Sequence, residues 1–366
     1  MITNIHIQNF KSIKKLAVET KKLNLLMGLN GMGKSTLIQS LLLLRQSADT
    51  DLRKLKLNGD LVNIGHGKDA LYNFADSDKL AFGLNFDIEG KQSECELEYQ
   101  YSKENDVLNL YSNKDSLLMP VLPLFSNKFI FLNAERKAPA TDYEMSVDKV
   151  ENLMLGIHGE LAVHFLSRYG EEIQVADNLC LSSTPSKFLI HQVQSWMNVI
   201  SPGIDIDIKD YQDIDRTVIS YGFKTDSIST NKFRPTNVGF GISYILPVLV
   251  ACLCGKYELI IMENPEAHLH PKGQAKMGEL MARCADCGTQ LFIETHSDHL
   301  LNGIRVAVKE KVMSANDVRI NYFTKTVEDG QNFTKNHPIR IGVNGALSEY
   351  PDDFIDEWEN QLMKLL

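Results

Sequence analysis

The sequence predicts an α/β fold with an antiparallel β subdomain and a helical middle segment, and three patterns carry that prediction. An apolar strand over residues 23–27 leads into a glycine-rich turn and then into a helix over residues 34–45. Strands and helices alternate again over residues 240–294, which is the order typical of α/β proteins. Between about residues 70 and 132, short strands follow one another with polar turns between them, as in an antiparallel sheet.

The spacing of apolar residues defines the individual elements. A strand with nearly alternating apolar residues opens the chain, and residues 146–201 are rich in helical patterns. We expect the apolar strand KFIFL (128–132) to be part of the antiparallel sheet. The other expected strands are 2–10, 80–88, 94–102, 204–211, 217–223, 259–262 and 290–294, and the later helices are 240–254 and 271–284.

The composition is that of a globular protein that does not coat nucleic acid. Of its 366 residues 43% are hydrophobic and 23% are charged, and the net charge is -9. The charge is uneven, because the first 60 residues hold ten Lys or Arg and four acids, a balance of +6 against -15 for the remainder. We expect this basic part to be a solvent-facing strand edge and helix face that contacts nucleic acid weakly at most, and in a salt-sensitive way.

The chain shows no pattern of export or of membrane insertion. The start MITNIHIQNFKSIKK lacks the apolar core of a signal peptide, and the longest apolar stretch, 242–254, is too short for a bilayer and contains Pro247. Six cysteines in a chain of this size do not form a disulfide framework, and their close pairs lie on helical patterns rather than on zinc-binding turns. We therefore expect a cytoplasmic protein.

The stretch GLNGMGKST, residues 28–36, is the most specific motif. It fits G-x-x-x-x-G-K-[ST] and has the required apolar strand before it and helix after it. Its glycines allow backbone N–H groups to surround a polyphosphate, Lys34 reaches the β- and γ-phosphates, and the Ser35 hydroxyl is a ligand for Mg²⁺. The motif therefore predicts ATP and Mg²⁺ as cofactors, and the loop residues expected to bind them are Asn30, Gly31, Gly33, Lys34, Ser35 and Thr36.

The stretch IIMENPEAHLHP, residues 260–271, predicts a second part of the same site. Four apolar residues end in Glu263, which places a carboxylate at the tip of a central strand, where it holds Mg²⁺ directly or through water. An amide, Asn264, stands where such sites often place a second acid, and it cannot accept a proton. We expect Glu266 to be the general base, with the alternative that Glu266 is a turn or helix-cap residue and that Asn264 positions the water.

The stretch LFIETHSDHLL, residues 291–301, adds a histidine. A buried strand ends just before His296, so this residue is expected at the same sheet edge as the carboxylates, as a sensor of the γ-phosphate. The alternative is a histidine satisfied within the core. The pair His268 and His270 at i, i+2 suggests a structural or intersubunit loop rather than a metal site.

The order of these motifs, with TNVGFGISYILPVL before the acid strand, resembles the ABC-type ATPases of the RecF, SMC and OLD group. The whole chain is most similar to bacterial AAA-type ATPases that end in a short C-terminal domain of unknown function and are often found in phage-defence modules. The further matches to that family are NFKS (9–12), Glu135-Arg136 with Pro139, Gly159-Glu160, and YPDDFIDE (350–357).

The resemblance implies two loops that meet a second subunit. Gly239 and Gly241 belong to the signature loop that contacts the γ-phosphate of the partner subunit's ATP, and residues 269–271 belong to the D-loop. The chain departs from the family in that NVGFGIS lacks the usual serine, so this contact is expected to be weaker or to use Asn237. The usual acid pair is replaced at Glu263-Asn264, and no glutamine loop is visible, so hydrolysis is expected to be slow.

By this resemblance the chain is a P-loop ABC-type ATPase head with three parts: an N-terminal half of the head (1–132), a middle segment (133–232) and a C-terminal half (233–366). We expect a homodimer or higher oligomer that closes around ATP and Mg²⁺ and controls a separate effector protein, in bacterial anti-phage defence. Two alternatives remain, a DNA-repair or maintenance ATPase that acts directly on DNA, and a weakly hydrolysing nucleotide-binding scaffold. A nuclease domain and an SMC-type coiled coil are not expected.

Overall fold

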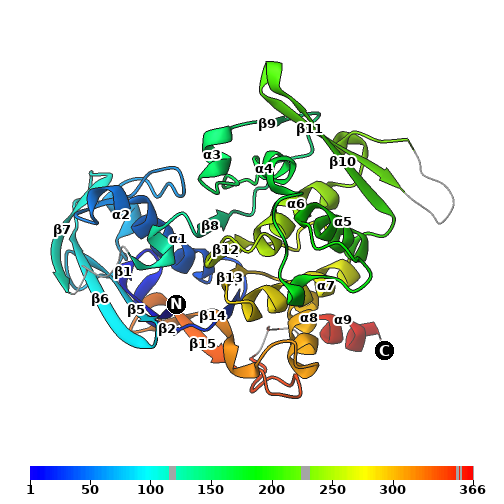
Figure 1. Cartoon of the computed structure of the whole chain (residues 1–366). Coiled ribbons are helices and arrows are strands. Elements are labelled where there is room, and N and C mark those ends of the chain that lie inside the picture. Colours follow the sequence, from blue (N-terminus) through cyan, green and yellow to red (C-terminus); the bar gives the residue numbers. More distant parts are fainter. Residues whose placement is uncertain (115–120, 224–230, 352–353, 355–356, 366) are drawn as a thin grey trace. The chain divides into compact units, whose positions relative to one another are not determined.

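The chain folds into two compact units, each of which is built from separate stretches of sequence (Figure 1). The first unit contains residues 1–126, 315–342 and 346–366, and the second contains residues 127–314 and 343–345. The sequence analysis divided the chain into three parts at residues 132 and 232. That division differs from these two units and stays a prediction. Part of the YPDDFIDE motif lies outside the described residues. The computed structural model describes residues 1–114, 121–223, 231–351, 354 and 357–365.

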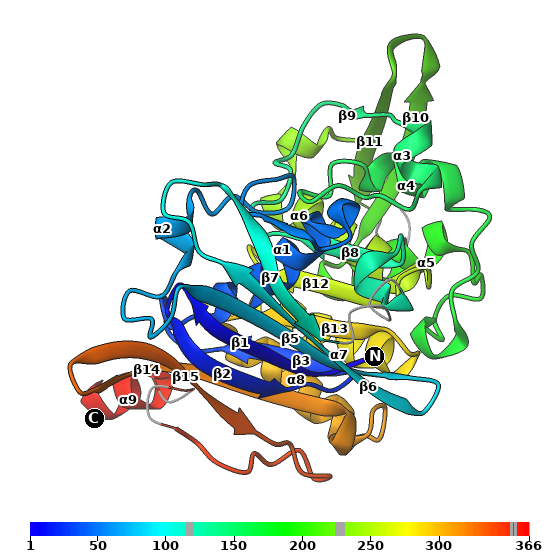
Figure 2. The ribbon, with the colours of Figure 1, turned by 90° about the vertical axis from the view of Figure 1, so that its left-hand side faces the viewer.

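An antiparallel sheet forms much of the first unit, as predicted. Its strand order is β2-β1-β5-β6-β7-β4, and Figure 2 shows most of these strands side by side. Apolar residues alternate along β1 and β2, so one face of the sheet is buried, and the rings of Phe10 and Phe82 meet edge to face on that side, 5.4 Å apart. The strands are β1 (Ile2–Phe10), β2 (Ile13–Glu19), β4 (Lys54–Lys56), β5 (Lys79–Ile88), β6 (Lys91–Gln100) and β7 (Val107–Lys114).

A second group of strands in the first unit leads to the glycine-rich loop. All residues of β3 are buried, and β3 pairs in parallel with β14, which itself pairs antiparallel with β15. The sequence analysis did not predict β14 and β15, because the outer half of β14 is largely polar and β15 has no regular alternation of apolar residues. Helix α1 begins directly after the loop, as expected. The elements are β3 (Leu23–Met27), α1 (Lys34–Gln46), α2 (Gly67–Ala70), β14 (Val318–Glu328), β15 (Gln331–Ile339) and α9 (Glu357–Leu365).

Three parallel strands organise the second unit, in the order β13-β12-β8. The expectation that KFIFL belongs to the antiparallel sheet was wrong, since β8 pairs in parallel with β12. The physical reason is that β8 and β12 are both continuous apolar runs, which suit parallel strands buried on both faces. The strands are β8 (Phe129–Leu132), β12 (Leu259–Glu263) and β13 (Gln290–Glu294).

Helices and a small sheet complete the second unit. The helical interpretation of residues 146–201 is confirmed in part, because Gly156 and Gly159 adopt positive φ and interrupt the first helical pattern, which covers residues 150–170. A separate three-stranded sheet has the order β10-β11-β9. Among the described helices, none is both long and apolar enough to cross a membrane. The elements are β9 (Tyr143–Glu144), α3 (Val147–Glu151), α4 (Ala162–Tyr169), α5 (Leu189–Ile200), β10 (Ile204–Tyr211), β11 (Arg216–Phe223), α6 (Phe240–Leu253), α7 (Pro271–Asp286) and α8 (Asp298–Lys309).

The close contact of α7 with α8 gives the first testable prediction. A β-carbon at Gly303 would lie 2.0 Å from the backbone oxygen of Ala275, so Gly303→Ala must push the helices apart. Overpacking costs about 1 to 3 kcal/mol, which exceeds the gain of about 1 kcal/mol in helix propensity. Urea denaturation should therefore show a lower free energy of unfolding. Val306→Ala, at an exposed position of the same helix, is the control, and equal stability of the two variants would contradict this packing.

Candidate functional site

The glycine-rich loop of the first unit is held in a shape that two of its glycines require. Gly28 and Gly33 have φ values of 135° and 106°, in the region that favours glycine. A β-carbon at Gly28 would lie 2.3 Å from the backbone oxygen of Phe323, and one at Gly33 would lie 2.5 Å from Thr334 Oγ1. The loop therefore tolerates no side chain at these two positions.

The loop places positive charge where a polyphosphate would bind. Lys34 is only 3% exposed, and its Nζ donates to the backbone oxygens of Gly28 and Leu29, both at 2.9 Å. Helix α1 begins after Gly33 without a capping side chain and without an acid in its first turn. A helix N-terminus of this kind attracts anions through its amide groups and its dipole. Ser35 follows Lys34 in this first turn, and Thr36 is buried behind it.

Thr334 and Ser12, which are distant from the loop in the sequence, hold it in place through hydrogen bonds. Thr334 on β15 is hydrogen-bonded through its Oγ1 to Ser12 Oγ at 2.9 Å and to the backbone oxygen of Met32 at 3.0 Å. The backbone N–H of Thr334 also donates to the oxygen of Ser12 at 2.9 Å. Ser12 belongs to the NFKS motif, whose role the sequence did not show. Nothing in the sequence around Thr334 pointed to the loop, because the two segments meet only in the folded chain.

Glu263 is fixed at the end of β12 in the second unit. Its Oε2 accepts a hydrogen bond from the backbone N–H of Ala134 at 3.1 Å. Burial raises the pKa of Glu263, while the Ala134 N–H and the charge of Arg136 oppose the shift. The loop after β8 thus sets the position of this carboxylate, which the sequence analysis did not foresee.

Glu266 lies in the turn after β12 and is 7% exposed. Its Oε1 accepts from the Thr295 hydroxyl at 2.6 Å and from the backbone N–H of His296 at 3.4 Å. Its Oε2 is buried with no hydrogen-bond partner among the described residues. Burial raises the pKa of Glu266, and the bond from Thr295 opposes the shift. A buried carboxylate with one open oxygen and a raised proton affinity can act as a general base.

The turn itself depends on the amide residue. Asn264 adopts φ 43°, and its backbone N–H donates to the oxygen of Glu294 at 2.8 Å, which ties the turn to β13. The Asn264 Oδ1 is buried and has no hydrogen-bond partner in the part of the chain that the structure describes. The cap of helix α7 is His270, whose side chain accepts from the N–H of Lys272, so Glu266 does not cap that helix.

His296 follows β13 at the same sheet edge, because Glu263 and Glu294 are paired in the parallel register of β12 and β13. Its side chain is exposed, which does not fit the alternative of a histidine satisfied within the core. The structure therefore brings together four predicted residues of the second unit, which are Glu263, Asn264, Glu266 and His296. The predicted phosphate-loop residues are brought together in the first unit.

The segments expected to form the signature loop and the D-loop lie against each other within the second unit. Gly239 precedes α6 and is exposed, and a β-carbon at Gly241 would lie 2.7 Å from the backbone oxygen of His268. The ring of His268 meets the ring of Tyr244 at 4.9 Å and that of Phe240 at 6.0 Å. Phe240 is nevertheless 56% exposed. The two loops thus form one surface with an exposed aromatic ring.

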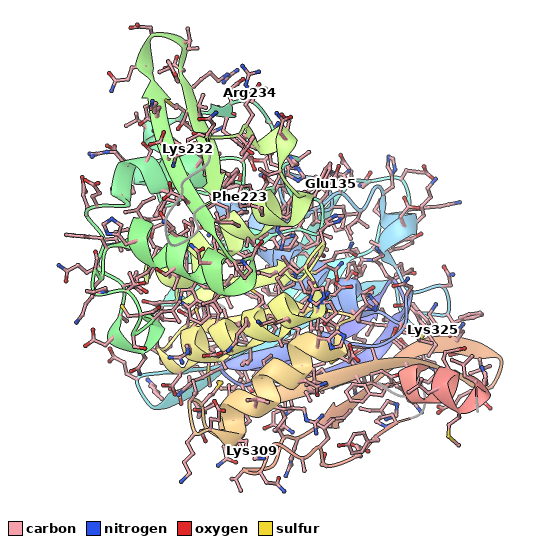
Figure 3. All side chains as sticks on the ribbon, turned by 90° about the vertical axis from the view of Figure 1, so that its right-hand side faces the viewer. Glu135, Phe223, Lys232, Arg234, Lys309 and Lys325 are labelled. Carbon is pink, nitrogen blue, oxygen red and sulfur yellow. The ribbon has the colours of Figure 1, made fainter. Side chains whose placement is uncertain are left out.

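The two short motifs of the middle segment bind each other. The backbone N–H of Lys137 donates to the oxygen of His158 at 2.8 Å, and the N–H of His158 donates to Glu160 Oε2 at 3.0 Å. A β-carbon at Gly159 would lie 2.4 Å from the Pro247 side chain of α6. Glu135 is exposed and lies at the surface in Figure 3. The Glu135-Arg136 segment is therefore anchored to the Gly159-Glu160 segment and, through it, to α6, which follows the expected signature loop and is called the signature helix below.

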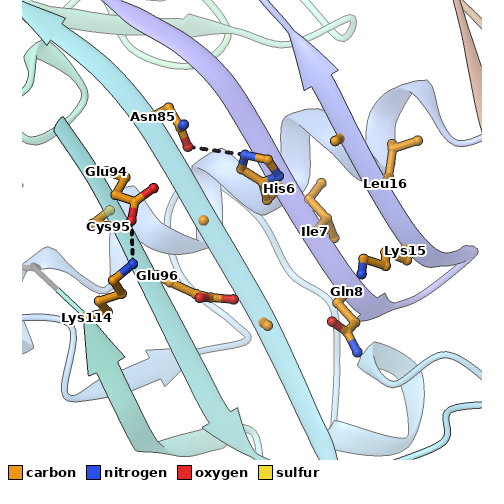
Figure 4. Close-up of a pocket in the computed structure, with 13 residues that line it drawn as sticks. His6, Ile7, Gln8, Lys15, Leu16, Asn85, Glu94, Cys95, Glu96 and Lys114 are labelled. Carbon is orange, nitrogen blue, oxygen red and sulfur yellow. Dashed lines mark hydrogen bonds and ion pairs between the residues drawn. The ribbon is translucent and has the colours of Figure 1, made fainter. Parts of the chain in front are cut away.

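A separate pocket of about 390 Å³ lies on the polar face of the antiparallel sheet of the first unit (Figure 4). Gly83 is one of the residues that line it. His6 Nε2 is hydrogen-bonded to Asn85 Oδ1 at 3.1 Å, and Glu94 forms an ion pair with Lys114. These side chains bind one another, so they do not require a ligand.

Stability measurements on Glu266→Gln test the burial of this carboxylate. Because the pKa of Glu266 is raised in the folded protein, its charge reduces stability above that pKa, and the loss disappears as the pH falls toward the ordinary value near 4.5. Glu266→Gln should therefore have a higher free energy of unfolding than the unchanged protein at pH 8, with a smaller difference at pH 5. Urea denaturation at the two pH values measures this. Glu171→Gln, at an exposed position, is the control, and a less stable Glu266→Gln at pH 8 would refute the prediction.

Three protein-family models match parts of the chain. Residues 1–147 match the model described as AAA ATPase domain. Residues 183–302 match the model described as AAA domain, putative AbiEii toxin, Type IV TA system. Residues 313–365 match the model described as Protein of unknown function (DUF3696). None of the curated proteins compared with the chain matches it.

Solved structures of SMC head domains are similar to the chain in fold. The head domain from Thermotoga maritima is 10% identical, with a TM-score of 0.50 over 92% of this chain and 98% of that one. An SMC head bound to the C-winged helix domain of ScpA is 13% identical, with a TM-score of 0.53 over the same shares. A head with an extended coiled coil, bound to the C-terminal domain of ScpA from Pyrococcus furiosus, is 12% identical, with a TM-score of 0.50 over 100% of this chain and 99% of that one. The predicted fold class is confirmed: the chain has the α/β fold of an SMC-type ATPase head.

Proposed function

We propose that the protein binds ATP with Mg²⁺ and hydrolyses ATP slowly, as a switch that closes with a second copy of itself and controls a separate effector protein. One observation carries the proposal, which is the phosphate loop folded around the uncapped N-terminus of α1 with Lys34 buried over it. The matches to ATPase-domain models support the same function.

The residues of the loop fit a magnesium nucleotide. Lys34 would exchange its two carbonyl contacts for phosphate oxygens, and the amide groups of the loop would surround the phosphates. Ser35 and Glu263 carry the oxygen ligands that Mg²⁺ prefers, and we assign both to the metal. Mg²⁺ would neutralise charge on the β- and γ-phosphates.

Proton transfer would fall to Glu266. Its Oε2 has no partner among the described residues, whereas Oε1 is fixed by Thr295, so the carboxylate is oriented with one oxygen open. Asn264 also presents an open oxygen, and an amide can orient a water without taking its proton. The usual pair of adjacent acids is replaced by Glu263-Asn264, and a base that stands three residues after Glu263 agrees with slow hydrolysis.

The second copy would meet the surface formed by the signature loop and the D-loop. Gly239 is exposed and Phe240 is 56% exposed, so this surface is open in one chain. A closed dimer would bury Phe240 and bring Gly239 and Gly241 to the partner's ATP. Two of the similar SMC heads are bound to a domain of ScpA, which supports a separate protein partner here. The toxin–antitoxin description of one family model agrees with a role in bacterial defence.

Two alternatives differ in what they bind or hydrolyse. A DNA-maintenance ATPase would use the basic first 60 residues, but three lysines of this part form ion pairs with acids, namely Lys21 with Glu19, Lys22 with Asp317 and Lys56 with Asp49. This pairing leaves less charge for phosphates and favours the switch. A nucleotide-binding scaffold would bind ATP without turnover. Steady-state ATPase assays with and without DNA separate the three functions.

Lys34→Ala tests the phosphate loop. Losing a charge-assisted phosphate contact should weaken ATP binding by about 1.5 to 3 kcal/mol and abolish measurable turnover. Calorimetric titration with ATP and Mg²⁺ measures the affinity. Lys54→Ala, an exposed lysine of the same unit, should bind ATP like the unchanged protein. If Lys34→Ala retains full affinity and turnover, the assignment of the loop is wrong.

A comparison of Glu266→Gln with Asn264→Ala tests the general base. Glu266→Gln should keep ATP affinity but reduce turnover about 10² to 10⁴ fold, the usual effect of losing a general base. Because ATP then persists, light scattering should show ATP-dependent dimers. Glu263→Gln should instead weaken the Mg²⁺-dependent binding of ATP. Should Asn264→Ala stop hydrolysis while Glu266→Gln does not, the amide handles the water.

A further inference from the structure

Arg136 is the most deeply buried charged group beside the carboxylates of the second unit. It is 4% exposed, and it follows β8, which runs parallel to β12. Its Nη1 donates to the backbone oxygen of Glu263 at 2.9 Å. Two residues earlier, Ala134 binds the carboxylate of Glu263. One short loop therefore holds both the backbone and the side chain of Glu263.

Other donors of this guanidinium have no partner in the described part of the chain, and neither do acceptors of the turn from Asn264 to Glu266. Its Nε and Nη2 are buried without hydrogen-bond partners among the described residues, and the same holds for Glu266 Oε2 and Asn264 Oδ1. Burial lowers the pKa of Arg136 to about 10, and the charges of Glu263 and Glu266 oppose that shift. A buried cation without compensation is costly, so its retention beside two acids needs an explanation.

The geometry points to Arg136 as a positioning residue that fixes the turn from Glu263 to Glu266 and keeps both carboxylates in place for ATP hydrolysis. The anchor on the Glu263 oxygen sets where the turn begins. The positive charge of Arg136 acts on both carboxylates and opposes the effect of their burial. The inference rests on the proposed ATPase function, and it gives the Glu135-Arg136 motif a role that the sequence did not supply.

The loop is stiff enough for this role because it is bound on its other side. The N–H of Asn133 donates to the oxygen of Ile157 at 3.0 Å, and the N–H of Lys137 donates to the oxygen of His158 at 2.8 Å. Both acceptors precede Gly159, which packs on Pro247 of the signature helix. A change at the signature helix would thus reach Glu263 through one hydrogen-bonded loop.

Kinetics of Arg136→Met and Arg136→Lys test the inference, with Arg319→Met as a matched control. Arg319 is also buried, pairs with Glu19 at 2.8 Å and has an unpartnered Nε, but it lies on β14 in the first unit. Arg136→Met should lower kcat about 10² fold with KM changed less than about threefold, since displaced catalytic groups slow the chemical step. Arg136→Lys keeps the positive charge but loses the planar arrangement of donors, so its kcat should fall roughly tenfold. Arg319→Met should lose stability but keep kcat.

A readout without nucleotide keeps the test independent of activity. Arg136→Met should lower the Tm by roughly 5 °C, because it leaves two buried carboxylates without a cation. A double variant combines Arg136→Met with Glu266→Gln. The Tm increase that Glu266→Gln causes in the Arg136→Met variant should be larger than the increase it causes in the unchanged protein. If Glu266→Gln changes the Tm equally in both proteins, Arg136 and Glu266 are not coupled and the inference is wrong.

The kinetic outcomes are equally decisive. If Arg136→Met folds and keeps kcat within threefold of the unchanged protein, the positioning role is wrong. If Arg136→Met fails to fold, full activity of Arg136→Lys would contradict the positioning role instead. If the unchanged protein hydrolyses no ATP, the proposed function fails, and the Tm comparison still decides whether Arg136 holds the acids.

Discussion

The parallel pairing of β8, β12 and β13 is the constraint on which the rest of the candidate site depends. Parallel strands in register end at one edge, so the pairing of Glu263 with Glu294 fixes where the following turns begin. The Asn264 N–H then binds the Glu294 oxygen, and Thr295 binds Glu266. A slip of one residue in this register would separate the acid turn from the histidine turn.

The second unit retains buried charge that a purely structural core would not keep. Glu263, Glu266 and Arg136 have few polar partners, and several of their polar atoms have none among the described residues. Such groups reduce stability unless they are paired, and they cluster at functional sites because catalysis needs perturbed proton affinities. The arrangement costs stability, and in the proposed function its benefit would be a buried, oriented carboxylate at Glu266 that can accept a proton.

The local sequence was sufficient to predict the strands and turns that carry the site residues. It was insufficient to predict the residues that hold these turns in place. The phosphate loop, the strand that ends at Glu263 and the strand before His296 each combine an apolar run with a characteristic turn, so they were predictable. The parallel pairing of β8 was not predictable, because an apolar run does not specify which strand it pairs with. Thr334 and Arg136 were not assigned roles, since their contacts are made only after distant segments meet.

The support of the phosphate loop by Thr334 has a consequence for synthesis. Met32 and Thr334 are 302 residues apart in the sequence, yet they share a hydrogen bond. At translation rates of about 5 to 20 residues per second, the loop emerges from the ribosome roughly 15 to 60 seconds before its support. During this interval β3 also lacks its parallel partner β14 and exposes an apolar edge. The glycine-rich loop therefore lacks this hydrogen bond, and β3 lacks this partner strand, until the segment that contains β14 and Thr334 has been synthesised.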